Sequence, residues 1–448
     1  MFLGGQFKFL RWLSFYLRFS LVEKVNYMKG KKPTYFPKLD DVRNAAKIIS
    51  EISEVTPLTE SIRLSKQYDC QVRLKREDLQ RVRSYKIRGA FNKISSLSKE
   101  ERAKGVICAS AGNHAQGVAF ACFHLKIKGT IYMPSVTPKQ KVEQTNLFGG
   151  DWVEIVLEGD TFDDASMAAQ KYGHETGKIF VHPFDDPKII EGQATVGLEL
   201  IEQTKAPIDY LFVCIGGGGL AAGLISVFSE LSPKTKIIGV EPKGAPSMKT
   251  SIESGKVVSL EQIDKFIDGA AVKKVGELTF PICSYYLENM ITVDEGKVCQ
   301  TILELYNRDA IVVEPAGALT ISALDDYKDE IKGKNVVCII SGSNNDITRT
   351  AEIKERALLY GKLKHYFIIR FPQRPGALKE FVVDILGPTD DITHFEYSKK
   401  SSRENAPAVV GIELKSPEDL QPLIERMKTN NFYGDYINDK PDLFEYLV

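Results

Sequence analysis

Short apolar runs rich in β-branched residues alternate with longer amphipathic stretches from about Thr34 to Tyr360. The clearest examples are VICAS, GTIYMP and YLFVCIG, each followed by a stretch whose apolar residues have helical spacing. Strands that alternate with helices of this length predict βαβ units and a mostly parallel α/β sheet with helices on both faces. The run NVVCIIS predicts the last strand of this body, and residues 347–360 predict its exit helix.

After Gly361 the pattern changes. It predicts strands at KHYFIIRFP, DITHFEYSK, APAVVGIELK and the final FEYLV, and helices at RPGALKEFVVDIL and SPEDLQPLIERMKTNN. This order, βαββαβ, is that of a ferredoxin-like split βαβ module. We therefore expect an α/β body over residues 29–361 and a small module over residues 362–448.

The first 28 residues are aromatic, apolar and basic, unlike the rest of the chain. Lys8, Arg11 and Arg18 interrupt the apolar run and would place charge in a bilayer core. No small-residue cleavage site follows the run. We interpret residues 1–28 as an extension outside the fold, with Met28 as the functional start, and a peripheral amphipathic anchor as the alternative.

Charge and cysteine usage narrow the class of protein. The chain has 59 Lys plus Arg and 59 Asp plus Glu, and this balance argues against a nucleic-acid binder. Its seven cysteines are scattered without a C-x-x-C pair, and its six histidines are dispersed. We expect reduced, packed thiols, no structural metal and a cytoplasmic protein without a membrane span.

Four loops carry residues suited to chemistry, and each follows or precedes a predicted strand. The first contains Lys86, in the run SYKIRGA before a helical stretch. A free lysine, with a pKa of ~10.4, is protonated, but a desolvated one near a helix N-terminus and a cationic neighbour becomes a neutral amine suited to Schiff-base formation. The alternative is a solvated surface lysine flanked by Arg83 and Arg88.

The second loop consists of Ser110, Ala111, Gly112, Asn113 and His114, between the strand VICA and the next helix. Backbone N–H groups in a first helical turn, with a glycine that lets the chain bend closely, form a site for a carboxylate. The Asn113 amide can bond a ring oxygen. An ordinary helix N-cap is the alternative.

The third loop consists of Gly216, Gly217, Gly218 and Gly219, followed by Leu220, and it lies between YLFVCI and a helix. Four glycines leave the backbone amides unobstructed, so a phosphate can bind there at the positive end of the helix dipole.

The fourth loop begins with Ser341, in the run SGSNN after the strand VVCII. Its alternative is an ordinary Ser/Gly turn. Because ligands of parallel sheets bind beyond the carboxyl ends of the strands, we expect the four loops to converge on one site.

Taken together, these motifs resemble the fold type II pyridoxal-phosphate enzymes, which have a tryptophan synthase β-like fold with two open parallel-sheet domains. Within them the match is to the threonine dehydratases, through KREDLQ, VRSYKIRGAF, SAGNHAQGVA, IGGGGLAAG, VEPAGA and SGSNND. The resemblance covers residues 31–448.

This resemblance implies a role for each motif. Lys86 would form the Schiff base with pyridoxal 5'-phosphate and then act as the base at the substrate Cα. Asn113 would bond the phenolic oxygen of the cofactor, Ser341 would face its pyridine nitrogen, and Tyr85 would pack on its ring. The loop that would hold the phosphate is Gly216, Gly217, Gly218, Gly219 and Leu220, and the loop that would hold the substrate carboxylate is Ser110, Ala111, Gly112, Asn113 and His114.

The implied reaction is deamination of L-threonine, a small amino acid, to 2-oxobutanoate and ammonia, the first step of isoleucine biosynthesis. Relatives such as serine racemase place a divalent cation after the strand that follows the glycine loop. Here Glu241 and Ala245 fit that site, but Ser247 replaces its second carboxylate, so we predict no metal.

The C-terminal module resembles the ACT-like regulatory domain of biosynthetic threonine dehydratases, in a single copy. This implies feedback inhibition by isoleucine and a homotetramer. The turn that would line the effector site contains Arg374, Pro375, Gly376 and Ala377. The alternative is a packing module that only builds the oligomer.

Other functions stay open at this point. An L-serine/threonine dehydratase and a threonine synthase share the fold, and a non-catalytic amino-acid sensor would use the C-terminal module alone. A dinucleotide-dependent oxidoreductase is suggested by Gly217, Gly219 and Ala222, which fit G-x-G-x-x-G/A, and by Glu241, which ends the next strand.

Overall fold

The computed structural model describes residues 30–397 and 405–440. Their contacts divide the chain into two compact units. The first holds the described residues up to Val293 together with Val313–Asn344, and the second holds Asp294–Val312 together with the described residues from Asn345 onward. The proposed extension, residues 1–28, lies outside the described residues.

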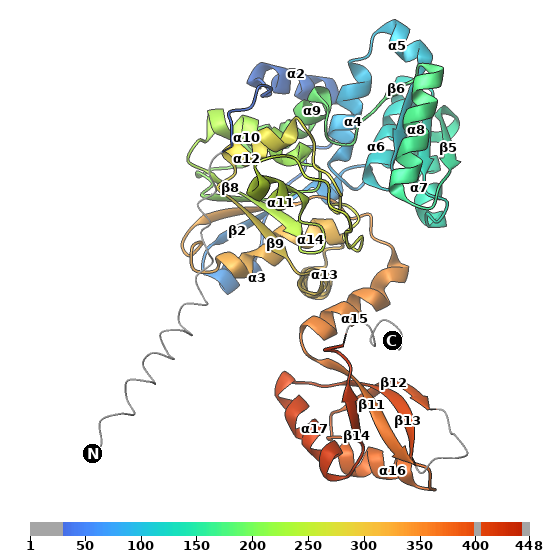
Figure 1. The fold of residues 1–448 in the computed structure, drawn as a ribbon. Helices are drawn as coiled ribbons and strands as arrows, with labels where there is room; N and C mark the ends of the chain where they lie inside the picture. The colour runs from blue at the N-terminus through green and yellow to red at the C-terminus, as the bar shows by residue number, and fades with distance from the viewer. Residues whose placement is uncertain (1–29, 398–404, 441–448) are drawn as a thin grey trace. The chain divides into compact units, whose positions relative to one another are not determined.

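The first unit contains two open sheets (Figure 1). The larger has the order β1-β2-β10-β7-β8-β9, and its neighbouring strands are parallel except for β1 and β2. The smaller has the order β5-β4-β3-β6 and is parallel throughout. Their strands are β1 (Leu58–Glu60), β2 (Gln71–Arg76), β3 (Val106–Ala109), β4 (Gly129–Met133), β5 (Val153–Leu157), β6 (Ile179–Phe180), β7 (Tyr210–Cys214), β8 (Lys236–Pro242), β9 (Asn289–Val293) and β10 (Asn335–Ile340). The α/β fold with two open parallel sheets is therefore confirmed.

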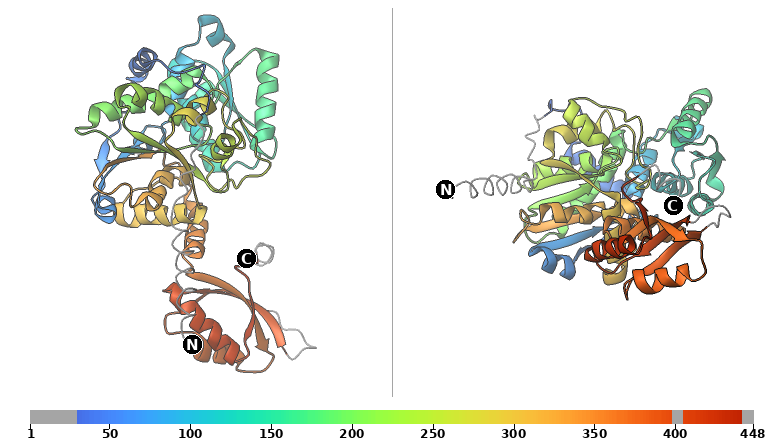
Figure 2. Two further views of the ribbon diagram at one scale, coloured as in Figure 1. Left: turned by 60° about the vertical axis from the view of Figure 1, so that its left-hand side comes forward. Right: turned by 60° about the horizontal axis from the view of Figure 1, so that its bottom comes forward.

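Helices cover these sheets, as the views in Figure 2 show. Strands β3, β4 and β7 are buried along their whole length, which explains why their sequences are continuous apolar runs. The α-helices of the first unit are α2 (Leu39–Ile49), α3 (Ile62–Tyr68), α4 (Lys86–Ser95), α5 (Lys99–Lys104), α6 (Asn113–Leu125), α7 (Lys139–Gly149), α8 (Phe162–Thr176), α9 (Pro187–Gln203), α10 (Gly219–Leu231), α11 (Ser247–Ser254), α12 (Thr279–Tyr286) and α14 (Pro315–Ser322). Short 3-10 helices are η1 (Glu77–Leu79), η2 (Gly150–Trp152) and η3 (Ala323–Tyr327).

Two glycines allow helix α4 to approach helix α9 closely. A Cβ at Gly192 would lie 2.6 Å from the Cα of Gly89, and a Cβ at Gly89 would lie 2.8 Å from the carbonyl oxygen of Ile189. Asp186 is the N-cap that precedes helix α9, and its carboxylate accepts hydrogen bonds from Lys188 N and Ile189 N. The close approach at Gly89 and Gly192 packs α9 against α4, the helix whose first residue is Lys86.

The second unit contains an antiparallel sheet of order β12-β13-β11-β14. Its elements are α13 (Glu295–Asp309), η4 (Ile347–Arg349), α15 (Thr350–Tyr360), β11 (Lys364–Pro372), α16 (Ala377–Glu380), the π-helical turn η5 (Phe381–Ile385), β12 (Asp391–Tyr397), β13 (Asn405–Glu413), η6 (Pro417–Asp419), α17 (Leu420–Thr429) and β14 (Tyr433–Tyr436). Alternate residues of β11, Phe367, Ile369 and Phe371, form one core with Phe381 and with residues of α17. The ferredoxin-like βαββαβ order is therefore confirmed.

Some details of this unit differ from the prediction. The fourth strand is Tyr433–Tyr436, which the sequence pattern did not indicate, and the predicted strand at residues 444–448 lies outside the described residues. The predicted exit helix is 3-10 over its first three residues and α-helical from Thr350. Contacts group α13 and α15 with the C-terminal module, whereas the sequence pattern divides the chain after residue 361, and that boundary stays a prediction.

All seven cysteines are buried free thiols, as the sequence predicts. Among residues 30–397 and 405–440, no helix combines the length and the apolar character that crossing a bilayer needs.

Candidate active site

Lys86 is the first residue of α4, and backbone contacts tie the residues before it to the end of β10. Ser84 forms a bridge with Gly342, and Tyr85 N donates to Ser341 O at 3.2 Å. Ser343 N also donates to Arg83 O at 2.9 Å. The lysine loop and the serine loop, which the sequence separates by some 250 residues, therefore meet at the carboxyl edge of the larger sheet.

The Lys86 amine donates one hydrogen bond, to Pro183 O at 3.1 Å, and lies 5.3 Å from the centre of the Tyr85 ring. Desolvation lowers the pKa of Lys86 to about 8, although the charges of Cys214 and Glu314 act in the opposite direction. Burial also raises the pKa of Tyr85 well above its ordinary value. A lysine in this setting supplies a neutral amine at a far lower pH than a surface lysine does.

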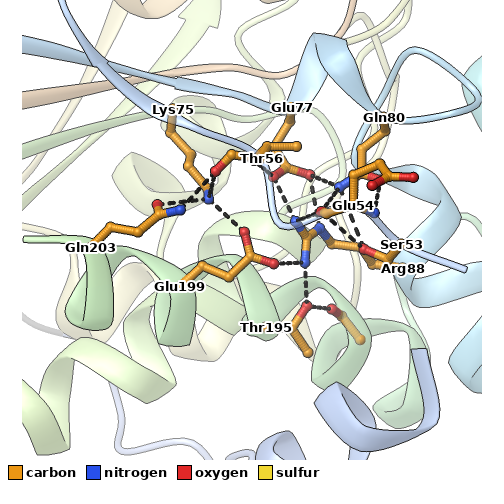
Figure 3. Close-up of polar contacts among 11 residues, drawn as sticks. Ser53, Glu54, Thr56, Lys75, Glu77, Gln80, Arg88, Thr195, Glu199 and Gln203 are labelled. Atoms are coloured by element: carbon orange, nitrogen blue, oxygen red, sulfur yellow. Dashed lines mark hydrogen bonds and ion pairs between the residues drawn. The ribbon is translucent and has the colours of Figure 1, made fainter. Parts of the chain in front are cut away.

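A buried ion network holds α4 in place (Figure 3). Arg88, two residues after Lys86, donates to both carboxylate oxygens of Glu77 and to Glu199 Oε1 at 2.6 Å. The Glu199 carboxylate also accepts a 2.5 Å hydrogen bond from Lys75. The network joins β2, η1, α4 and α9, and it holds the N-terminal part of α4, where Lys86 lies, against these elements.

The second loop places Asn113 at the start of α6 and leads His114 into the interior. Asn113 Nδ2 donates to Glu314 Oε1 at 2.7 Å, and Asn344 Nδ2 donates to Asn113 Oδ1 at 2.6 Å. The His114 ring bonds Val181 O through Nε2 at 2.9 Å, and burial lowers its pKa to about 3. The His114 ring is thus neutral and donates its Nε2 hydrogen to the backbone carbonyl of Val181. At Gly112 the neighbouring space is open, because a Cβ there would meet nothing within 4 Å.

The glycine loop joins β7 to α10, and its neighbours leave no room for side chains. A Cβ at Gly217 would lie 2.2 Å from Cγ of Phe184, and Gly218 has φ of +92°, which favours glycine. Thr279 Oγ1 donates to Gly217 O at 2.6 Å. Leu220 packs its side chain into the core. The first N–H groups of α10 carry the positive end of the helix dipole, as a phosphate site requires.

Ser341 is 1% exposed, and its hydroxyl has no hydrogen-bond partner among the described residues. It interacts with the Cys214 thiol, but the pair lacks hydrogen-bond geometry. The Ser84 hydroxyl is likewise buried without a partner. Because buried polar groups are almost always paired, these hydroxyls indicate a polar ligand in this site. The amine, the helix start and the buried hydroxyls fit pyridoxal phosphate.

The segment 182–186 is a part of the site that sequence reasoning missed. His182 Nδ1 accepts hydrogen bonds from Phe184 N and Asp185 N, and the Asp185 carboxylate accepts from Glu277 N and Leu278 N. Pro183 O accepts from Lys86, so this segment connects the lysine to the glycine loop. The sequence did contain a signal for this segment, because a polar run that includes Pro183 follows β6, the strand that pairs with β3.

Glu241 has a different role from the ribose-binding acid that a dinucleotide enzyme needs. It is fully buried, and its two oxygens accept from Met248 N at 2.6 Å and Lys249 N at 3.0 Å. Burial raises its pKa to about 8. Ser247 donates to Val272 O. In the part of the chain that is described, no group of three or more His, Cys, Asp or Glu is arranged to hold a metal.

In the second unit, the predicted effector turn precedes α16. Arg374 is ion-paired with Glu380, and Gly376 has φ of +84°. Pro375 is exposed, whereas Ala377 is buried in the module's core.

Comparison with known proteins identifies two families along the chain. Residues 49–342 match the family described as "Pyridoxal-phosphate dependent enzyme", and residues 355–447 match "C-terminal regulatory domain of Threonine dehydratase". The chain is 55% identical over 411 residues to "L-threonine dehydratase biosynthetic IlvA" of Halalkalibacterium halodurans, which covers 92% of this chain and 99% of the relative. It is 52% identical over 413 residues to the protein of the same name from Bacillus subtilis, covering 92% and 98%.

Solved structures agree. The processed form of threonine deaminase isoform 2 from Solanum lycopersicum has a TM-score of 0.68 and 39% identity, covering 74% of this chain and 97% of that one. Maize serine racemase has a TM-score of 0.67 and 30% identity, covering 73% and 99%. The family and the cofactor expected from the motifs are thereby confirmed. This chain belongs to the biosynthetic L-threonine dehydratases, pyridoxal-phosphate-dependent lyases with a C-terminal regulatory domain.

Proposed function

We propose that this chain deaminates L-threonine to 2-oxobutanoate and ammonia, with Lys86 as both the cofactor-binding lysine and the base. The observation that carries these roles is the desolvated Lys86 amine, with its pKa lowered to about 8, on a loop whose Tyr85 N donates to the backbone of Ser341, a residue with an unpartnered hydroxyl. A surface lysine would not combine such a pKa with this burial, so the solvated alternative is disfavoured.

The cofactor supplies an electron sink for the charge that develops at the substrate Cα. The residues that would hold it are Lys86 and Tyr85, Asn113 at the phenolic oxygen, Ser341 at the pyridine nitrogen, and, at the phosphate, the loop of Gly216, Gly217, Gly218, Gly219 and Leu220. Once free, the Lys86 amine would hold the proton removed from Cα.

The substrate carboxylate would bind the backbone amides of the Ser110 to His114 loop. This assignment is supported by the open space at Gly112 and by its position before the start of α6. The His114 side chain contributes to holding the loop, because its ring bonds Val181 O in the interior.

The test is release of 2-oxo acid from L-threonine by the purified protein, with L-serine assayed in parallel. Lys86→Ala should lose both the visible absorption of bound cofactor and the activity, whereas Lys104→Ala, at an exposed position, should keep both. Activity of Lys86→Ala at the parent rate would rule out the proposed role of the lysine. Faster turnover of serine would favour an L-serine/threonine dehydratase instead.

We further propose that isoleucine binds the regulatory domain, near the turn of Arg374, Pro375, Gly376 and Ala377, and that the enzyme is a cytoplasmic homotetramer. The match to a regulatory domain and the positive φ at Gly376, which opens the turn before α16, support an effector there. We propose residues 29–361 as the catalytic domain and 362–448 as the regulatory one.

Isoleucine should suppress activity in the parent and less in Arg374→Ala, and light scattering gives the subunit number. If isoleucine does not change the activity, the proposed reaction stands and the proposed role of isoleucine as an effector is ruled out.

A further inference from the structure

We propose that Glu314 and Asn344 are positioning residues, which hold the Asn113 amide so that one Nδ2 hydrogen points to the cofactor. This inference rests on the proposed contact between Asn113 and the cofactor. Both residues belong to motifs of the sequence, VEPAGA and SGSNND, and the proposed roles above give neither Glu314 nor Asn344 a function.

The three side chains form a continuous chain of hydrogen bonds. Asn344 Nδ2 donates to Val82 O at 2.9 Å and to Asn113 Oδ1 at 2.6 Å. Asn113 Nδ2 then donates to Glu314 Oε1 at 2.7 Å. These contacts connect the loop after β10, the start of α6 and the residue before α14.

The groups at the two ends of this chain fix the orientation of both amides. The Val82 carbonyl can only accept, so Asn344 must turn its nitrogen toward it. Both Nδ2 hydrogens of Asn344 are then used, one on Val82 and one on Asn113, so Asn113 must present its oxygen to Asn344. Its own nitrogen faces Glu314, and one of its two hydrogens remains for a further acceptor. A flipped Asn113 would present an oxygen there instead.

Glu314 is held firmly enough to act as this anchor. It is 4% exposed, its N–H donates to Gly342 O at 3.2 Å, and a Cβ at Gly342 would lie 2.6 Å from Glu314 Oε1. Burial raises the pKa of Glu314 to about 7. A carboxyl oxygen accepts a hydrogen bond in either protonation state, provided that the proton is on the other oxygen, so the anchor works on both sides of this pKa.

Two nearly isosteric substitutions separate orientation from packing. In Glu314→Gln the amide oxygen still accepts from Asn113, so the affinity of the apoenzyme for pyridoxal phosphate should stay within about twofold of the parent. In Asn344→Asp the new carboxylate cannot donate to the Asn113 oxygen, so Asn113 lies between two acceptors, at positions 314 and 344, and its nitrogen is no longer held on the side that faces the cofactor. We expect the dissociation constant of pyridoxal phosphate to rise on the order of tenfold, the effect of one hydrogen bond.

The measurement is titration of each folded apoenzyme with pyridoxal phosphate, followed by visible absorption. It is repeated in the Asn113→Ala background, where Asn344→Asp should have no further effect because the group it orients is absent. Glu314→Ala should weaken cofactor binding less than Asn344→Asp does, because it removes the acceptor of Asn113 but leaves the Asn344 donor that orients the Asn113 oxygen. Asn289→Ala is the matched control, since Asn289 Nδ2 donates to Tyr327 Oη and both residues belong to elements other than the Lys86, Asn113 and Ser341 loops, β9 and η3.

Each result has one interpretation. If Asn113→Ala binds the cofactor as the parent does, the proposed Asn113 contact fails and the inference fails with it. If Asn113→Ala binds weakly but Asn344→Asp and Glu314→Ala bind normally, only the inference is overturned. An equal loss from Asn344→Asp with and without Asn113 also overturns it, because the effect would then be on general packing.

Discussion

The Arg88 guanidinium donates two hydrogen bonds to the Glu77 carboxylate, from Nε and Nη2, and each is 2.8 Å long (Figure 3). The two side chains are 1% and 0% exposed. Burial alone would raise the pKa of Glu77, but the charges of Arg88 and Lys75 lower it. The pair is therefore ionised inside the protein, and its Arg88 follows Lys86 by two residues in α4.

Removing one partner of this pair should cost far more than removing a surface ion pair. Arg88→Met leaves the buried Glu77 carboxylate without its guanidinium and removes one of the two cations paired with Glu199, and such a loss typically costs about 3 to 5 kcal/mol. We expect the free energy of unfolding, measured by urea denaturation of the holoenzyme, to fall by that amount.

Arg43→Ala is the control, because the Arg43 and Asp40 side chains are 55% and 92% exposed. Its loss should change the free energy of unfolding by less than about 1 kcal/mol. Equal effects of the two substitutions would contradict the view that the buried network anchors α4.

The rate at which the apoenzyme captures pyridoxal phosphate should depend on the Lys86 amine. Only the neutral amine reacts, and desolvation lowers its pKa to about 8. The capture rate, followed by absorption after mixing, should therefore rise with pH through a midpoint near 8 and then level off. A midpoint near 10, the value of an ordinary lysine, would contradict the assigned environment.

The Glu314→Gln variant gives a directional control for this midpoint. The Glu314 carboxylate raises the pKa of Lys86, and its own pKa of about 7 leaves it largely ionised at pH 8. Neutralising it should move the midpoint to a lower pH. A shift to a higher pH would mean that the two groups do not interact as the structure indicates.

Glu241 should make stability depend on pH. Burial raises its pKa to about 8 in the folded state, against an ordinary value of 4.5. The folded state thus binds more protons than the unfolded state between these values, so this group's stabilising contribution is lost as pH rises toward and through 8.

Glu241→Gln should remove that part of the slope in a plot of unfolding free energy against pH. Glu51→Gln, at an exposed position, should leave the slope unchanged. Parallel slopes for the parent and Glu241→Gln between pH 5 and 8 would show that Glu241 does not titrate in this range.

The sequence predicted the first unit well because its strands β3, β4 and β7 are buried along their whole length and its loops carry distinctive residues. The apolar run VICA and the glycines after YLFVCI are visible without a structure, and β3 and the glycine loop lie where they were expected. The strand Tyr433–Tyr436 escaped because it is only partly buried and contains a glycine, Gly434, so it lacks an apolar pattern.

For the proposed site, too, some features could be predicted from the sequence and others could not. Lys86, Asn113 and Ser341 were indicated by motifs at strand ends, but the contacts that hold them could not be. Asp185 binds the backbone of residues 277 and 278, and Asn344 binds Asn113 across 231 positions of the chain. Such pairings depend on which loops the sheet brings together, and a single sequence does not state this.

Two glycines near the site should respond differently to alanine. In Gly217→Ala the new methyl would stand 2.2 Å from Phe184 Cγ, so either the ring or the glycine loop must move. We expect pyridoxal phosphate to bind on the order of tenfold more weakly, as measured by titration of the apoenzyme. Adding Phe184→Ala should recover part of this loss, because it removes the ring that the methyl meets.

In Gly112→Ala the methyl meets nothing within 4 Å, so folding and cofactor affinity should match the parent. The methyl would instead occupy space beside the loop proposed to bind the substrate carboxylate, and the KM for L-threonine should rise. Initial rates over a range of L-threonine concentrations give this KM. An unchanged KM would place the carboxylate elsewhere, whereas weaker cofactor binding in this variant would mean that the loop contacts the cofactor and not the substrate.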